Sequence, residues 1–186
     1  TAAHCTFNRS PENIIIVVGT NFLSSGGITH SVLEIVNHPS YIPELELNDV
    51  AVLQTVEPFV FTASVSPIPL GANIIGGGAT TTAAGWGKSF HLDEEYSEEL
   101  RFINLQTITN ADCRARLQAG NRPFELIFDS SLCTFNAIGQ GGEWNLNVMK
   151  RNDRFFVVCA GDTGGALVST NNQVIGIVSW HDICAM

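Results

Sequence analysis

The residues of this chain best suited to chemistry are a hydroxyl, an imidazole and a carboxylate in three separate segments. Thr163 lies within the glycine-rich run Cys159–Leu167, whereas His4 and Asp49 lie far upstream. A hydroxyl becomes a nucleophile when an imidazole takes its proton and a carboxylate orients that imidazole. Taken alone, His4 would more often be a structural or surface histidine, and Asp49 a turn residue. The segments around the three residues decide between these interpretations.

Five short strings occur in order along the chain: Thr1-Ala2-Ala3-His4-Cys5, Asn48-Asp49-Val50-Ala51-Val52-Leu53, Gly85-Trp86-Gly87, Gly161-Asp162-Thr163-Gly164-Gly165-Ala166 and Val178-Ser179-Trp180. The first, second and fourth resemble T-A-A-H-C, N-D-I-A-L-L and G-D-S-G-G-P of the chymotrypsin/trypsin family, and the other two match further landmarks of that family. Asp49 follows His4 by 45 positions, a spacing similar to the family's. The order histidine, aspartate, nucleophile is typical of chymotrypsin-like enzymes and differs from that of subtilisin and the α/β-hydrolases.

The resemblance implies a role for each matched residue in peptide hydrolysis. His4 is the base, Asp49 fixes its tautomer, and Thr163 occupies the place of the nucleophilic serine. The backbone N–H groups of Gly161 and Thr163 form the oxyanion hole, and Ser179 supports the aspartate.

Threonine at position 163 is the main departure from the family pattern. Its hydroxyl keeps the reaction chemically possible, but familiar threonine nucleophiles use their own N-terminal amine as the base, and Thr163 is internal. The added methyl stiffens χ1, and an off-rotamer side chain costs about 0.5–1.5 kcal/mol. A misplacement of about 1 Å can cost roughly 100-fold in rate. We expect turnover that is lower by orders of magnitude, or absent.

Asp162 is a second expected defect. In the family the matching carboxylate pairs with the amine that zymogen cleavage creates, and this chain contains no such amine. The resemblance therefore predicts an unpaired carboxylate at Asp162 and displaced oxyanion donors, each of which typically contributes about 100- to 1000-fold to the rate.

The substrate pocket departs from the trypsin pattern as well. Val157 stands where trypsin-like members have an aspartate, which argues against Arg/Lys specificity. His181 replaces the glycine after Ser179-Trp180, so a ring beside Trp180 narrows the predicted pocket entrance.

The chain has five cysteines, an odd number that by itself indicates a free thiol or a partner elsewhere. The resemblance implies two disulfides, Cys113–Cys133 and Cys159–Cys184. It also implies that the partner of Cys5 lies upstream of the histidine motif, in a segment that we expect to be missing here. Disulfides are typical of secreted, extracellular proteins.

The elements that position these residues are predicted to be strands. Short β-rich runs separated by Gly, Asn, Pro and Ser clusters indicate an antiparallel all-β fold. The runs are Ile14–Val18, Ser31–Val36, Val50–Val56, Ile103–Thr109, Phe155–Val158 and Val174–Trp180. The resemblance implies two six-stranded antiparallel β-barrels that are incomplete at the N- and C-terminal edges, a partial first barrel with the crossover at 1–78 and a partial second barrel at 79–186. A short helix is expected over Ala111–Ala119, after a cap at Thr109-Asn110.

Composition narrows the classes of partner. A net charge of −9 argues against nucleic acid and against anionic membrane surfaces. The histidines lack zinc-like spacing, and the segment Gly19–Ser31 lacks the acidic ligands of a calcium loop, so we predict no metal and no cofactor. The resemblance implies a polypeptide substrate, or a protease or inhibitor as partner.

Three functional hypotheses follow. The first is a chymotrypsin-like serine endopeptidase homologue, catalytically impaired or inactive, that acts by binding in a secreted protease cascade. The second is an active endopeptidase that uses Thr163 and has non-tryptic specificity. The third is an incomplete gene product whose unpaired sheet edges cause aggregation.

Overall fold

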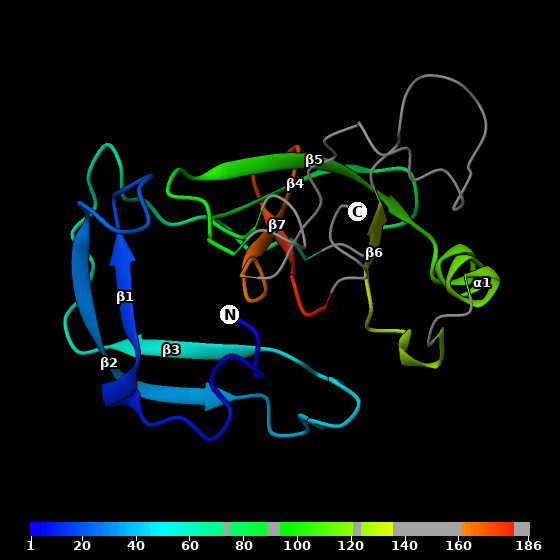
Figure 1. Cartoon of the computed structure of the whole chain (residues 1–186), viewed down its shortest axis with the longest axis horizontal. Helices are drawn as coiled ribbons and strands as arrows, with labels where there is room; N and C mark the ends of the chain where they lie inside the picture. Colours follow the sequence, from blue (N-terminus) through cyan, green and yellow to red (C-terminus); the bar gives the residue numbers. More distant parts are fainter. Residues whose placement is uncertain (73–74, 89–93, 121–123, 136–160, 181–186) are drawn as a thin grey trace.

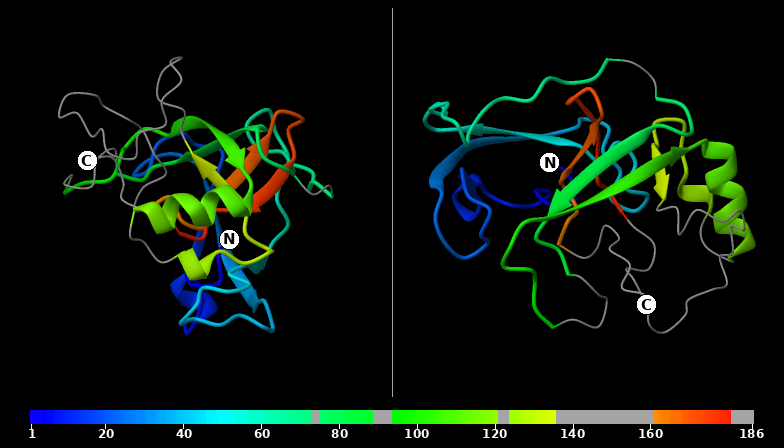
Figure 2. Two further views of the ribbon diagram at one scale, coloured as in Figure 1. Left: turned by 90° about the vertical axis from the view of Figure 1, so that its right-hand side faces the viewer. Right: turned by 90° about the horizontal axis from the view of Figure 1, so that it is seen from above.

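Two antiparallel sheets make up most of the molecule (Figure 1). The computed structural model describes residues 1–72, 75–88, 94–120, 124–135 and 161–180. The views in Figures 1 and 2 place the first sheet at one end of the molecule and the helix α1 at the other, with the N-terminal residues between the two sheets.

The first sheet has three strands in the order β1-β2-β3, namely Ile15–Val18, Ile28–Asn37 and Ala51–Thr55. Runs of β-branched residues fit a pleated, half-buried surface, which explains why these segments are extended. A bulge between Val32 and Glu34 shifts the register of β2 against β3. Asp49 lies two residues before β3, so this sheet positions the carboxylate of the candidate triad.

The second sheet has five strands in the order β6-β5-β4-β7-β8. In that order the strands are Cys133–Phe135, Arg101–Ile108, Thr80–Gly85, Ala166–Ser169 and Val174–Ile177. Its core consists of three buried residues and three partly buried ones packed against them: Ala83, Leu105 and Leu167, with Ile103, Leu132 and Ile175. The loop that contains Thr163 leads into β7, and Ser179 follows β8.

The helix α1, Asn110–Ala119, begins one residue before the predicted start at Ala111 and ends where predicted. Thr109 caps it, since its hydroxyl accepts from the backbone N–H of Asp112 at 3.1 Å. The predicted disulfide Cys113–Cys133 is present and joins this helix to β6. Two short 3-10 helices, Pro11–Asn13 and Phe124–Leu126, complete the described elements.

The predicted fold class is confirmed, because the described chain is mostly β with two sheets and few helices. Three strands were not predicted from the sequence: β4, β6 and β7. β4 consists of threonine, alanine and glycine, and the other two are short, so none has an extended apolar signal. The run Phe155–Val158 lies outside the described residues. The sheets fall on either side of residue 78, and the division into domains 1–78 and 79–186 stays a prediction.

We expect Leu105→Ala to lower the free energy of unfolding by about 2–5 kcal/mol, because it leaves a cavity in the core of the second sheet. Phe102→Ala is the matched control on the same strand. Leu105 is 3% exposed and Phe102 is 70% exposed, so the control should change stability by less than about 1 kcal/mol. Urea denaturation measures both, and equal losses would contradict the assignment of this core. A non-cooperative transition of the unaltered chain would favour the incomplete gene product.

Candidate active site

The imidazole and the carboxylate predicted to act together are in direct contact. His4 Nδ1 lies 2.7 Å from Asp49 Oδ2, and the backbone N–H of His4 donates to Asp49 Oδ1 at 2.8 Å. The N-terminal segment is held against β3 by a reciprocal pair of backbone bonds. Ala51 N–H donates to Thr1 at 2.8 Å, and the Thr1 amine donates to Ala51 at 3.2 Å. Two short pairings therefore fix the histidine relative to the aspartate.

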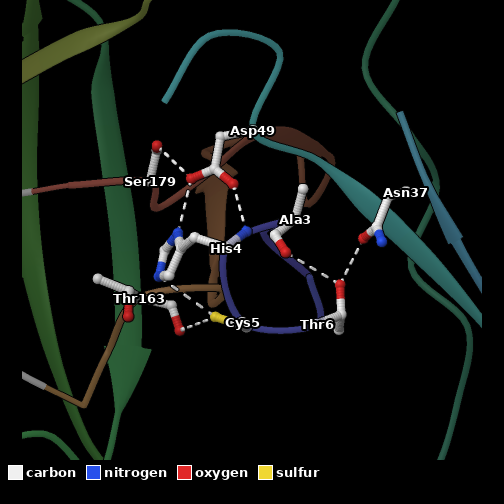
Figure 3. A network of polar contacts seen from close by, with 8 residues as sticks. All are labelled: Ala3, His4, Cys5, Thr6, Asn37, Asp49, Thr163 and Ser179. Atoms are coloured by element: carbon white, nitrogen blue, oxygen red, sulfur yellow. Dashed lines mark hydrogen bonds and ion pairs between the residues drawn. The ribbon is translucent and has the colours of Figure 1, made fainter. Parts of the chain in front are cut away.

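Ser179 completes the surroundings of the carboxylate from the second sheet. Its hydroxyl donates to Asp49 Oδ2 at 2.5 Å. The Asp49 side chain is only 2% exposed, so its charge depends on these donors for the stabilisation that water would otherwise give. The structure thus brings His4, Asp49 and Ser179 together, as the sequence predicts (Figure 3).

The pKa of the Asp49 carboxyl lies below its usual value. Burial by itself raises this pKa. The hydrogen bond from Ser179, the side-chain and backbone hydrogen bonds from His4, and the charge of His4 together outweigh burial. The carboxylate is therefore ionised at neutral pH, and it accepts a hydrogen bond from the Nδ1–H of the imidazole. This leaves Nε2 as the nitrogen of His4 that can accept a hydrogen bond.

Thr163 is close to His4 but is not coupled to it by a hydrogen bond. Within the described part of the chain, no such bond joins the Thr163 hydroxyl to the imidazole, and in Figure 3 that hydroxyl has no dashed line. His4 Nε2 instead lies 3.4 Å from the sulfur of Cys5. The same sulfur lies 3.7 Å from the carbonyl oxygen of Thr163. The contact between Cys5 and Nε2 was not predicted from the sequence, where the adjacency of Cys5 to His4 is the signal that points to it.

The loop around Thr163 is shaped by glycines. Gly161 and Gly164 adopt φ values of 101° and 86°, a region that favours glycine. Gly164 N–H donates to Val178 at 2.7 Å, and Val178 N–H donates to Gly165 at 2.9 Å. Among the described backbone groups, none accepts from the N–H of Gly161 or Thr163. Their role in an oxyanion hole stays a prediction.

The expectation that Asp162 is unpaired is wrong. Its Oδ1 accepts from the backbone N–H of Gly87 at 2.7 Å. A Cβ placed on Gly85 or Gly87 would collide with the Asp162 carboxylate. The absence of side chains at these two positions therefore leaves the space, or cradle, that the carboxylate occupies. The physical reason for the error is that a backbone N–H can also donate a charge-assisted hydrogen bond to a carboxylate, and a sequence motif does not show backbone donors.

Several predicted residues lie outside the described residues, namely Val157, Cys159, His181 and Cys184. Trp180 is described and is half-buried, but its place in a substrate pocket stays a prediction. Within the described ranges, no cluster of three or more His, Cys, Asp or Glu side chains is arranged to hold a metal ion. No helix in the described part of the chain is long and apolar enough to cross a membrane.

Comparison with known proteins assigns the chain to a family of proteases. The Trypsin family profile matches residues 1–143 and 151–186. The chain therefore belongs to the trypsin family, the chymotrypsin-like serine proteases.

Curated relatives agree with this family, and a solved structure agrees with the fold. The chain is 29% identical to Trypsin beta of Drosophila erecta over 185 residues and 31% identical to Trypsin, alkaline C, of Manduca sexta over 188 residues. All of this chain is aligned in both cases, and it spans 65% and 66% of the length of these relatives. The fold is similar to that of the scabies mite inactivated protease paralogue S-D1, with a TM-score of 0.81 and 21% identity, over 97% of this chain and 71% of that one.

We expect Asp49→Asn to destabilise the fold in a pH-dependent manner. A carboxyl whose pKa is lower in the folded state stabilises the fold above its unfolded pKa of about 3.9, and this contribution is lost as the pH falls through the folded value. The variant should therefore lose about 1–3 kcal/mol near pH 7, and the difference from the wild type should shrink below about pH 4. Asp129→Asn is the control, since that side chain is fully exposed. Denaturant titrations at several pH values measure both, and a deficit independent of pH would contradict the expected linkage.

We expect Gly87→Ala to lower the free energy of unfolding by about 1–3 kcal/mol, because the new methyl collides with the Asp162 carboxylate. Gly76→Ala is the matched control, since a Cβ there meets nothing within 4 Å. Thermal or urea denaturation compares the two, and equal stabilities would show that the cradle is not rigid.

Proposed function

We propose that this chain is a chymotrypsin-like serine endopeptidase homologue whose peptide hydrolysis is severely impaired or absent, and that it acts by binding polypeptides or other proteases. One observation carries this proposal. The His4–Asp49–Ser179 relay is assembled, yet the imidazole nitrogen that should face the nucleophile faces the Cys5 thiol at 3.4 Å.

The proposal follows from the chemistry of the template. The base must take the proton of the attacking hydroxyl as the new bond to the substrate carbonyl forms, so the hydroxyl and Nε2 must share a hydrogen bond. Such a bond is absent between the described His4 and Thr163 side chains. Rotating the Thr163 hydroxyl toward Nε2 also moves its methyl, and the β-branched side chain has few rotamers from which to choose.

An active endopeptidase that uses Thr163 is the second candidate. The hydrogen-bonded arrangement of His4, Asp49 and Ser179 favours it, because a buried, ionised carboxylate that orients a histidine is one of the parts that peptide hydrolysis needs. Catalytic hydrogen bonds also tighten in complexes with substrate. In this case the substrate would be a polypeptide with a non-tryptic residue at the cleavage site, since Val157 stands in place of the acidic pocket residue.

We propose a secreted, extracellular setting for either activity. The Cys113–Cys133 disulfide supports this, because disulfides persist in oxidising compartments. The names of the relatives, Trypsin beta and Trypsin, alkaline C, support a polypeptide substrate. The net charge of −9 favours basic protein partners over nucleic acid.

Labelling with a fluorophosphonate probe, which reacts with activated hydroxyl nucleophiles, tests the proposed function. We expect the wild type to remain unlabelled and Thr163→Ser to gain labelling and peptidase activity by about 100-fold or more. Thr62→Ser, at an exposed site remote from His4, is the matched control and should leave the protein unlabelled.

Strong labelling of the wild type that disappears in Asp49→Asn would contradict the impaired homologue and establish the second candidate. If neither the wild type nor Thr163→Ser is labelled, a defect beyond the methyl of Thr163 blocks the reaction, and the binding role is retained.

A further inference from the structure

We infer that Asn48 is a positioning residue of this site, which fixes the direction of the Asp49 side chain toward His4. Two features of Asn48 carry the inference: a left-handed backbone conformation and a side-chain hydrogen bond to a neighbouring segment. The inference rests on the His4–Asp49 pair of the proposed function and names the residue that holds this pair in place. It requires neither hydrolysis of peptides nor a reaction at Thr163.

The backbone turns sharply at Asn48, directly before Asp49. Asn48 has a φ of 58°, in the left-handed region that glycine, asparagine and aspartate adopt more readily than other residues. Its carbonyl oxygen accepts from the N–H of Val50 at 2.8 Å, which closes a three-residue turn with Asp49 at its centre. The direction of the Asp49 side chain therefore depends on the conformation of Asn48.

The Asn48 side chain ties this turn to the segment that follows β2. Its Nδ2 donates to the carbonyl oxygen of Ser40 at 2.8 Å, and the N–H of Ser40 donates to His38 Nδ1 at 3.1 Å. The N–H of His38 in turn donates to the carbonyl oxygen of Val50 at 2.9 Å. The residues on both sides of Asp49 are thus held by one short segment, residues 38–40.

The same end of β2 also holds the turn that contains His4. Asn37 is the last residue of β2, and its Oδ1 accepts from the hydroxyl of Thr6 at 2.6 Å (Figure 3). Both partners of the hydrogen bond between His4 and Asp49 are therefore fixed to the end of one strand. On the carboxylate side, the Asn48 amide makes this connection.

The bond between the carboxylate and the imidazole tolerates little displacement. The Asp49 side chain is 2% exposed, and its Oδ2 lies 2.7 Å from His4 Nδ1. Hydrogen bonds weaken steeply when their geometry departs from the favourable range. Loss of the Asn48 amide should therefore weaken the bond between Asp49 and His4 although Asn48 lies outside that bond.

Exchange of the His4 Nδ1–H proton with water tests the inference. Proton NMR of the 186-residue chain with isotope-labelled histidine follows this proton, whose protection depends on the bond to Asp49. Asn48→Gly removes the side chain, and glycine adopts a positive φ without strain. We expect exchange to become about 10-fold faster in this variant, a change of the size expected for the loss of one hydrogen bond.

Asn172→Gly is the matched control. Asn172 has a similar φ of 56° and is exposed in the turn between β7 and β8. This variant should leave the exchange rate of the His4 proton unchanged. An exchange rate in Asn48→Gly equal to that of the wild type, or an equal increase in Asn172→Gly, would overturn the inference.

A double-mutant cycle tests the same inference through stability alone. If Asn48 acts through Asp49, Asp49→Asn should already have lost most of the stability that Asn48→Gly removes near pH 7, so the two losses should not add. The loss in Asn172→Gly should add to that of Asp49→Asn. Additive losses for Asn48→Gly would contradict a positioning role. The proposed function fails independently, through fluorophosphonate labelling of the wild type, because an active enzyme needs the same placement of the carboxylate.

Discussion

The Asp49 carboxylate is the acceptor on which the whole site depends. Its two oxygens take hydrogen bonds from the backbone and ring of His4 and from the hydroxyl of Ser179. These donors come from the N-terminal segment and from the chain after β8. One buried carboxylate therefore holds together the segment before β3, the N-terminal segment and the end of the second sheet. A carboxylate that is 2% exposed would be costly without such donors. The hydrogen bonds that orient His4 therefore also stabilise the buried charge in the fold.

The loop around Thr163 is organised by a second carboxylate. Asp162 is held by the backbone N–H of Gly87, and the glycines at 85 and 87 leave the space that its oxygens occupy. This contact links the turn after β4 to the loop before β7, two strands that pair directly in the second sheet. The position of Thr163 thus follows from sheet pairing and from a backbone donor, and both remain when the hydroxyl-bearing side chain changes.

Sequence patterns predicted the parts of the molecule that are tied to specific chemistry. The neighbours of Asp49 and the Cys113–Cys133 disulfide were predicted because the motifs around them resemble those of the trypsin family, and the resemblance implies both. The strand β4 escaped because threonine and alanine carry little apolar signal, and its strand character comes from pairing with β5 and β7. Two contacts of the site were not predicted for another reason. The partner of Asp162 is the backbone N–H of Gly87, and the contact of Cys5 with His4 Nε2 depends on the rotamer of Cys5. A sequence motif specifies neither of them.

The imidazole has only one nitrogen to share between two candidate proton donors. With Nδ1 committed to Asp49, the lone pair of Nε2 can accept one strong hydrogen bond, and the Cys5 sulfur already lies at 3.4 Å. A serine hydroxyl could compete for that lone pair by rotating freely about χ1. A threonine hydroxyl must carry its methyl through the same rotation, beside a sulfur that itself approaches Gly164. Under the proposed function, the methyl of Thr163 restricts its hydroxyl, and the Cys5 sulfur lies beside the Nε2 acceptor that the hydroxyl would need.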